Sequence, residues 1–250
     1  MILAIETATD VCGVALVHEG GVVAERSVVE KKIHSEKLLP MIDEVLRGVS
    51  MNLGDVGTVA VSIGPGSFTG LRIGLSTAKG LAMARRIPIV PVPTLDAMAF
   101  EYLRSGGAHE GETVCPLIDA KRDEAYFSFY TVSGAGVSRK APYEIAGVSK
   151  ISDAARAFGI VTFIGDGTGK MEADGKAEGS FRITRYAVCS AASVGLLAES
   201  GAGTLAVGEF GMLEPMYVRD FVATQPGVKR HHNIQRIPVE FSQITHSSKD

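Results

Sequence analysis

The sequence has few cysteines, no long apolar run and no excess of charge of one sign. The cysteines at 12, 115 and 189 lie far apart and form no C-x-x-C pair, which indicates neither a disulfide framework nor a cysteine zinc site. A net charge of -3 gives no general attraction for nucleic acid or an anionic membrane, so we expect any RNA contact to be local or through a partner. No apolar stretch could cross a bilayer, and Glu6 interrupts the apolar N-terminus, so we expect no membrane contact, no signal peptide and a cytoplasmic location.

The composition that remains is that of a soluble globular protein. With 250 residues, of which 46% are hydrophobic and 21% charged, the chain can form one large domain or two small ones. In the first part, β-branched apolar runs predict strands and apolar residues at helical spacing predict helices. The predicted elements are strands at 2–6, 13–18 and 22–29, a helix from Ser35, a strand at 56–63, a helix at 70–85, a strand at 87–92 and a helix at 95–103.

Ser35 is a candidate N-cap for the first helix, and Pro40 removes a backbone donor in its second turn. We therefore expect a late start or a kink in this helix. The glycine-rich stretch 105–112 is the best candidate for a domain boundary.

The order of elements repeats after this boundary. Strands are expected at 114–119, at 124–132 and near 143–145, followed by a helix at 151–158, a strand at 161–164 and a helix at 189–199. The sequence therefore predicts a duplicated α/β unit, with the order βββαβα occurring twice, in a first lobe of residues 1–105 and a second lobe of residues 106–228. Residues 229–250 lose the periodicity and are expected to be a mobile tail or an appendage.

The stretch VSIGPGSFTGLRIG, residues 61–74, has the context of a phosphate-binding loop, because a strand precedes it and a helix follows. Its G-x-G-x-x-x-G spacing and the absence of a lysine argue against that function. The alternative is a sharp turn in which Gly64, Gly66 and Gly70 allow close packing, with Ser67 or Thr69 capping the helix. The small residues of that helix would let the chain's own sheet, or a helix of a second protein, approach closely.

Two acids near strand ends, Glu6 and Asp119, are candidate site residues. With Thr7 and Thr9 they could flank a cleft that holds a metal–nucleotide complex, although acids at strand ends are often only solvated. The GDGTGK stretch at 165–170 lacks the spacing of a P-loop and is interpreted as a turn. The six histidines include no i,i+4 pair, and no G-x-S-x-G elbow occurs, so we expect neither a metal site nor a serine nucleophile.

Several segments together resemble the bacterial TsaB (YeaZ) family. They are ILAIETAT at the start, HSEKLLPMID at 34–43, GPGSFTGLRIGLSTAKGLA at 64–82, LIDAKRDEAY at 117–126 and EPMYVR at 214–219. The resemblance implies a two-lobe actin-like, Hsp70-like fold. It also implies a non-catalytic scaffold that positions TsaD, the subunit holding the metal and active site, with the ATPase TsaE as a third partner. The complex makes N6-threonylcarbamoyladenosine at position 37 of tRNAs that read ANN codons.

The resemblance further implies a partner surface on the first two helices, which the isolated chain can also use to form a homodimer. The residues carried over are His34, Ser35, Leu38, Leu39 and Ile42 on the first helix and Leu71, Leu75, Ala78 and Lys79 on the second. No cofactor is expected on this chain, since ATP and metal belong to the partner subunits. The alternatives are an ATP-dependent phosphotransferase that uses Glu6 and Asp119, and a metallopeptidase.

Overall fold

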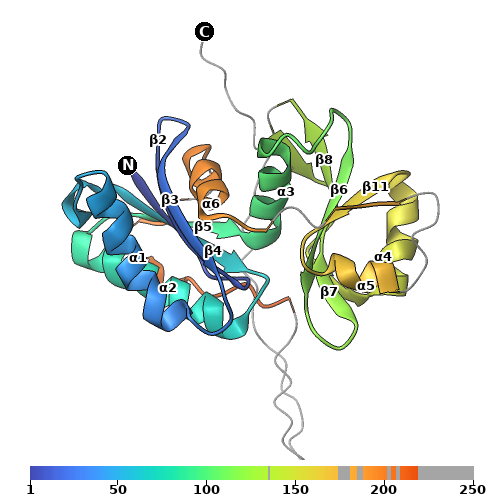
Figure 1. Cartoon of the computed structure of the whole chain (residues 1–250), viewed down its shortest axis with the longest axis horizontal. Helices are drawn as coiled ribbons and strands as arrows, with labels where there is room; N and C mark the ends of the chain where they lie inside the picture. The colour runs from blue at the N-terminus through green and yellow to red at the C-terminus, as the bar shows by residue number, and fades with distance from the viewer. Residues whose placement is uncertain (135, 174–180, 185–187, 202–203, 207–208, 219–250) are drawn as a thin grey trace, which may run out of the picture.

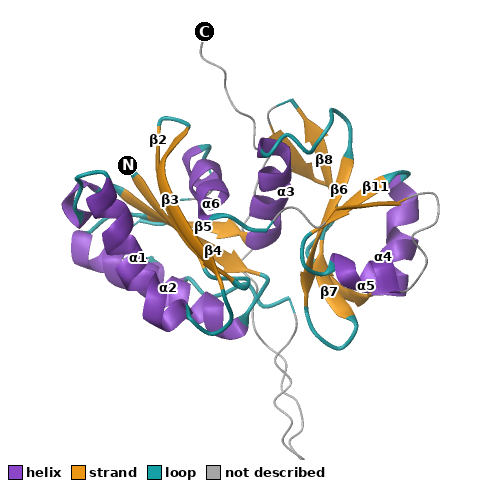
Figure 2. Ribbon diagram, in the orientation of Figure 1, coloured by secondary structure: helices purple, strands orange, loops and turns teal. Residues whose placement is uncertain are grey.

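The structure is a computed structural model that describes the chain except for residues 135, 174–180, 185–187, 202–203, 207–208 and 219–250. The tail expected at 229–250 lies outside the described residues. Two sheets with helices packed on them form the two lobes of the molecule (Figures 1 and 2). None of the helices in the described part combines the length and the hydropathy needed to cross a membrane.

The first sheet contains five strands in the order β3-β2-β1-β4-β5. Strands β1, β4 and β5 are parallel, whereas β2 runs antiparallel to both β1 and β3. The helices α1 and α2 cover one face of this sheet (Figure 1). The elements are β1 (Ile2–Glu6), β2 (Val11–His18), β3 (Gly21–Val29), α1 (His34–Gly48), η1 (Leu53–Asp55), β4 (Thr58–Gly64), α2 (Phe68–Arg85), β5 (Ile89–Pro93) and α3 (Thr94–Arg104).

The second sheet repeats this topology in the order β10-β7-β6-β11-β12, with β6, β11 and β12 parallel. A short hairpin of β8 and β9 also pairs with β6. The duplicated unit is therefore confirmed. Its elements are β6 (Thr113–Asp119), β7 (Glu124–Phe127), β8 (Tyr130–Ser133), β9 (Gly136–Arg139), β10 (Glu144–Gly147), α4 (Val148–Ala155), η2 (Arg156–Phe158), β11 (Val161–Ile164), α5 (Thr168–Ala173), β12 (Phe181–Thr184) and α6 (Ala191–Glu199).

Three local predictions are wrong. The single strand expected at 124–132 is split into β7 and β8, because the break lies opposite Cys115 and Pro116 of β6, and Pro116 has no backbone N–H to contribute to a ladder. Helix α1 starts at His34 with Ile33 in the N-cap position and no side-chain cap, so Ser35 is not the cap. The late start is also wrong, since α1 begins at His34 and continues through Pro40, which is exposed.

Helix α6 packs on the first sheet, although it follows the second sheet in sequence. Its main neighbours are β1 and β2, and a Cβ at Gly195 would press against Val17 and Ala4. Helix α3 in turn contacts β6 and β9 of the second sheet. The two helices lie together between the sheets and share one apolar core with both of them (Figure 1). The two lobes are therefore connected by packing as well as by the chain, because α3 of the first lobe contacts the second sheet and α6 of the second lobe packs on the first sheet.

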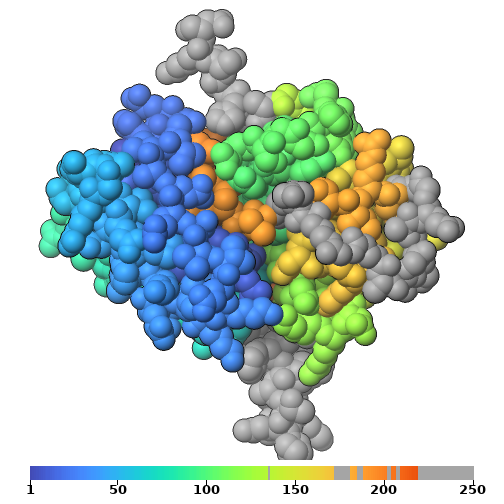
Figure 3. Space-filling view, in the orientation of Figure 1, coloured from blue at the N-terminus to red at the C-terminus, as the bar shows by residue number. Residues whose placement is uncertain are grey.

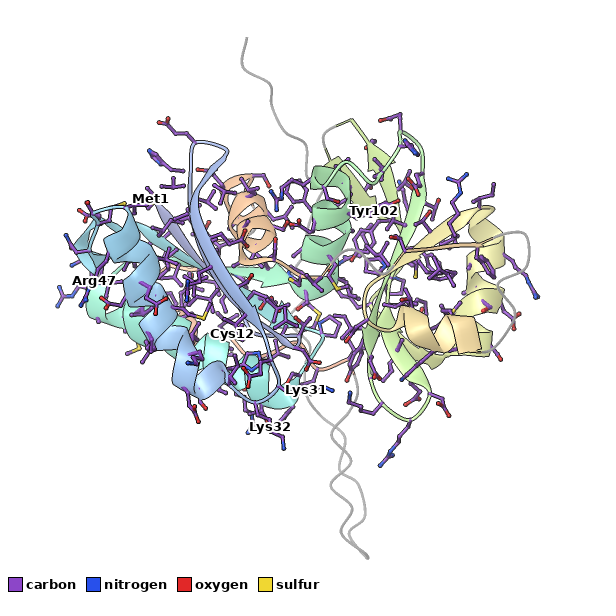
Figure 4. The ribbon with its side chains drawn as sticks, viewed as in Figure 1. Met1, Cys12, Lys31, Lys32, Arg47 and Tyr102 are labelled. Atoms are coloured by element: carbon purple, nitrogen blue, oxygen red, sulfur yellow. The ribbon has the colours of Figure 1, made fainter. Side chains whose placement is uncertain are left out.

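Buried hydrogen bonds reinforce this junction. The hydroxyls of Tyr130 and Tyr143 donate to Oδ1 of Asp96 at 2.6 and 2.8 Å. Tyr102, also on α3 (Figure 4), donates to Glu112 at 3.3 Å. Burial raises the pKa of Asp96, although its hydrogen bonds from the two tyrosines oppose the shift.

Candidate functional site

The glycine turn between β4 and α2 packs against the β1–β2 turn of the same lobe. Ser67 caps α2 by accepting a hydrogen bond from the Gly70 N–H, and its own N–H donates to the Ala8 carbonyl at 2.6 Å. Gly64 has a φ of +113°, a conformation that favours glycine. The glycine turn is thus held to the β1–β2 turn by a backbone hydrogen bond.

Gly66, Gly70 and Gly74 are the positions where a side chain cannot be accommodated. A Cβ at Gly66 would overlap the Ala8 carbonyl oxygen, and one at Gly70 or Gly74 would overlap Thr7. The Thr7 hydroxyl donates to the Gly70 carbonyl at 2.8 Å. The close backbone approach expected of these glycines is present, because residues 7 and 8 lie directly beside them.

Glu6 lies fully buried at the end of β1. Its Oε1 accepts hydrogen bonds from the N–H groups of Ala8 (2.9 Å) and Thr9 (3.1 Å) and from the Thr9 hydroxyl, and its Oε2 accepts one from the Cys189 thiol at 3.1 Å. Burial raises the pKa of Glu6 despite these donors. Burial and the nearby Glu6 charge also raise the pKa of Cys12, which lies in the first lobe (Figure 4), to about 11. Glu6 therefore ties the β1–β2 turn to the segment that begins α6.

Three carboxylates of the chain converge on the N-terminus of α6. Besides Glu6, which binds Cys189, Glu25 accepts from the Ala192 N–H at 3.1 Å. Glu101 accepts from the hydroxyls of Ser190 and Ser193. A helix N-terminus attracts anions through its unpaired N–H groups and its dipole. At the N-terminus of α6 the anions are carboxylates of the chain itself, those of Glu6, Glu25 and Glu101.

Asp119 at the end of β6 is paired with a lysine. The Lys170 ammonium on α5 donates to Asp119 Oδ1 at 2.6 Å and to the Glu124 carbonyl at 2.8 Å, and the Lys121 N–H also donates to Asp119. Burial alone would raise the pKa of Asp119, but these hydrogen bonds and the two lysine charges lower it. The turn predicted at 165–170 is confined to residues 165–167, because α5 already begins at Thr168. Sequence reasoning missed that Lys170 of this helix would meet Asp119.

Glu6 and Asp119 each have a partner within the chain. Glu6 points to the α6 segment and Asp119 to Lys170. The pKa of Asp166, which follows β11, is raised by burial and by the charges of Asp119 and Asp10. Asp10 lies in the β1–β2 turn, so a charge of the first lobe acts on a carboxyl of the second. In the described ranges, no group of three or more histidine, cysteine, aspartate or glutamate residues is arranged to hold a metal ion.

Six of the nine side chains expected on the partner surface point into the chain's own core. Leu38, Ile42, Leu71, Leu75 and Ala78 are buried, and the buried His34 ring hydrogen-bonds through Nε2 with the carbonyls of Thr9 and Val11 at 3.1 Å. Ser35 and Leu39 are exposed and Lys79 is half-buried.

The outer surface of α1 and α2 carries Leu39, which was expected on the partner surface, together with Met83 and Phe68, which were not. Leu39 is 57% exposed, Met83 64% and Phe68 38%. This surface, which we call the outer α1–α2 face, lies on the outside of the first lobe, with α1 at the front in the space-filling view (Figure 3). Arg47 at the end of α1 marks its border in Figure 4. Sequence spacing could not separate these positions from the buried ones because both occur on the same helices.

These features define a two-lobe protein of the actin-like, Hsp70-like fold, built from a duplicated α/β unit. The candidate ligand-binding acids Glu6 and Asp119 are hydrogen-bonded to Cys189 and Lys170 of the same chain. The chain belongs to the family of TsaD, tRNA N6-adenosine threonylcarbamoyltransferase, whose model matches residues 13–191. The predicted resemblance to TsaB (YeaZ) proteins is confirmed by individual relatives.

Two curated relatives are named tRNA threonylcarbamoyladenosine biosynthesis protein TsaB. The chain is 39% identical to that of Haemophilus influenzae over 130 residues, which cover 51% of this chain and 52% of the relative. It is 40% identical to that of Escherichia coli over 129 residues, covering 52% and 54%. The matched part of the chain thus spans about half the length of these curated relatives.

Similarity in structure extends further along the chain. YeaZ from Pseudomonas aeruginosa has a TM-score of 0.74 and 27% identity, covering 86% of this chain and 98% of that chain. A second crystal structure, of an uncharacterized protein with similarity to peptidase YeaZ from the same species, has a TM-score of 0.75 and 28% identity, covering 87% and 99%. Both lobes are therefore shared with these proteins.

Proposed function

We propose that the chain is a non-catalytic scaffold subunit in the biosynthesis of N6-threonylcarbamoyladenosine at position 37 of tRNAs that read ANN codons. In this function the chain binds and positions a TsaD-type transferase in the cytoplasm. TsaE joins the two proteins in a ternary complex, and tRNA binds to that complex and not to the isolated chain. ATP and metal are held by the partner subunits, and the isolated chain can form a homodimer through the same face.

The observation that supports the proposal is a difference between the two sides of the first lobe: the polar groups of one side are bound within the chain, whereas the other side exposes apolar side chains. On the side toward the second lobe, Glu6, Glu25 and Glu101 occupy the α6 N-terminus, and Thr7 fills the glycine turn. On the other side, the outer α1–α2 face exposes large apolar side chains that gain free energy when a partner covers them. The names of the TsaB relatives and the TsaD family model supply the process in which such a partner would act.

The phosphotransferase alternative has less support, because its two carboxylates already have partners within the chain. Glu6 accepts four hydrogen bonds, and Asp119 is bound by Lys170. Titration calorimetry with ATP and with ADP separates the two functions. Tight nucleotide binding to the isolated chain would favour the phosphotransferase, whereas the scaffold requires none.

The partner surface is tested with matched charge insertions. Leu39→Glu places a carboxylate on the outer α1–α2 face, while Ile160→Glu places one at a 60% exposed apolar position of the second lobe. We expect Leu39→Glu to weaken co-purification with the TsaD-type subunit of the same organism and Ile160→Glu to leave it intact. Equal co-purification of both folded variants would show that the partner binds elsewhere.

A further inference from the structure

After α6, which packs on the first sheet, the chain continues along the first lobe as a C-terminal strap, defined here as residues 204–206 and 209–217. Leu205 exchanges two backbone hydrogen bonds with Ile89 of β5, at 2.8 and 3.1 Å. Phe210 and Leu213 are buried in the core that α1 and α2 form with the first sheet. The Met216 N–H then donates to the Ile63 carbonyl at 2.6 Å, immediately before the glycine turn. The strap thus reaches the N-terminal end of α2.

At this end, Phe68, Arg72 and Tyr217 form an exposed group that we call the aromatic–arginine cluster. The guanidinium carbon of Arg72 lies 3.9 Å from the centre of the Phe68 ring, and the rings of Phe68 and Tyr217 are 5.4 Å apart. Arg72 Nε also donates to the Tyr217 hydroxyl at 3.3 Å. The strap therefore fixes the arginine in place before any ligand arrives, which lowers the entropy cost of binding through it.

The chemistry of the cluster favours a carboxylate ligand. Arg72 uses one N–H on Tyr217, and none of the ion pairs among the described residues involves it. A guanidinium presents its remaining N–H groups as a planar fork that matches a carboxylate. Phe68 is 38% exposed and Tyr217 41% exposed, so the carboxylate would be flanked by apolar contacts. Arginine and tyrosine are also the residues enriched where protein interfaces gain most of their affinity.

The cluster continues the outer α1–α2 face rather than forming a separate patch. At 100° per residue, Phe68, Arg72, Ser76, Lys79 and Met83 fall on one side of α2. Four of them are exposed and Lys79 is half-buried. Phe68 and Arg72 are thus one end of the stripe that Met83 completes.

We propose that the aromatic–arginine cluster is a binding site for the protein that covers the outer α1–α2 face, and that it takes an acidic side chain of that protein with an apolar neighbour. The proposal rests on the proposed function and extends it to a residue of the C-terminal strap. Tyr217 acts as a positioning residue, since its hydroxyl holds Arg72 on Phe68.

The test measures the dissociation constant of the whole chain with the TsaD-type transferase subunit of the same organism by titration calorimetry. Arg72→Ala should weaken binding about tenfold, as expected of an interface hot spot. Arg72→Lys should recover little of the loss, because an ammonium group cannot form the planar fork. Arg156→Ala removes an exposed arginine of the second lobe and should change binding less than about twofold. Circular dichroism confirms that each variant is folded.

Three other results overturn the proposal in distinguishable ways. If the unaltered chain binds the transferase, and Arg72→Ala and Phe68→Ala bind it as tightly as the unaltered chain does, the cluster is not a contact and the proposed function stands. If the unaltered chain does not bind the transferase, the proposed function fails and the inference with it. If the variants bind the transferase normally but their complex loses affinity for an anticodon stem-loop RNA, the cluster is an RNA contact.

Discussion

Lys170 on α5 lies 2.6 Å from Asp119 on β6, so the acid expected to face a metal–nucleotide complex is neutralised by a cation of the same chain. The same ammonium reaches the Glu124 carbonyl of β7 at 2.8 Å. One lysine thereby joins a short helix to two antiparallel strands. The pair is half-buried, which limits its contribution to stability but gives it a clear pH dependence.

Lys170→Ala is expected to destabilise the fold by about 1 kcal/mol at pH 7. The pKa of Asp119 is lowered in the folded state, so the pair stabilises above the ordinary pKa of the carboxyl and loses its effect as the pH falls through the lowered value. Urea unfolding should therefore show a larger difference between variant and unaltered chain at pH 7 than at pH 3. Lys121→Ala, whose ammonium is exposed and 3.4 Å from Asp119, is the matched control. An effect of the same size at both pH values would contradict this account.

Gly70→Ala should destabilise the fold by about 1–3 kcal/mol, because the new methyl group overlaps the Thr7 carbonyl. Gly80→Ala lies on the same helix with no heavy atom within 4 Å of the added Cβ, and it should stabilise by up to about 1 kcal/mol. Chemical unfolding of the two variants compares them directly. If alanine is tolerated equally at both positions, the glycine turn does not depend on close packing.

Asp96→Asn should change the pH dependence of stability. The pKa of Asp96 is raised in the folded state, so the folded protein binds a proton more readily than the unfolded one, and stability from this group falls as the pH rises above about 4. Asparagine keeps an acceptor for Tyr130 and Tyr143 without this dependence.

The free energy of unfolding of the Asp96→Asn variant should therefore increase relative to the unaltered chain between pH 4 and pH 8. Asp96→Ala leaves the Tyr130 and Tyr143 hydroxyls without their acceptor, and it should be about 2–3 kcal/mol less stable than Asp96→Asn at every pH in this range, since neither variant titrates at this position. A constant difference between Asp96→Asn and the unaltered chain would show that Asp96 does not titrate differently in the two states.

Residues 1–105 alone should not fold, because α6 covers β1 and β2 and the C-terminal strap covers β5. Adding residues 106–250 as a second chain should restore the circular dichroism of the whole protein. A cooperative thermal transition of the first fragment alone would contradict this, and would show that α6 is dispensable for the first sheet.

Much of the fold follows from local patterns, since strand β1 and the Ser67 cap of α2 lie where the sequence predicts them. Periodicity shows which residues of a helix are apolar, but not whether Leu39 or Leu38 faces the sheet when both are leucines on adjacent positions. The partners of Glu6 and Asp119 lie 183 and 51 residues away, and local patterns carry no information on such distant contacts. The lysine of GDGTGK, which follows a predicted strand and a glycine turn, is the feature of the sequence that indicates a cation near Asp119.

The most direct test of the central claim is the rate of threonylcarbamoyladenosine formation in tRNA with purified TsaD-type and TsaE-type subunits, with and without this chain. The scaffold account predicts that modification requires the chain and that Leu39→Glu reduces it while Ile160→Glu does not. Full modification in the absence of the chain would contradict the account.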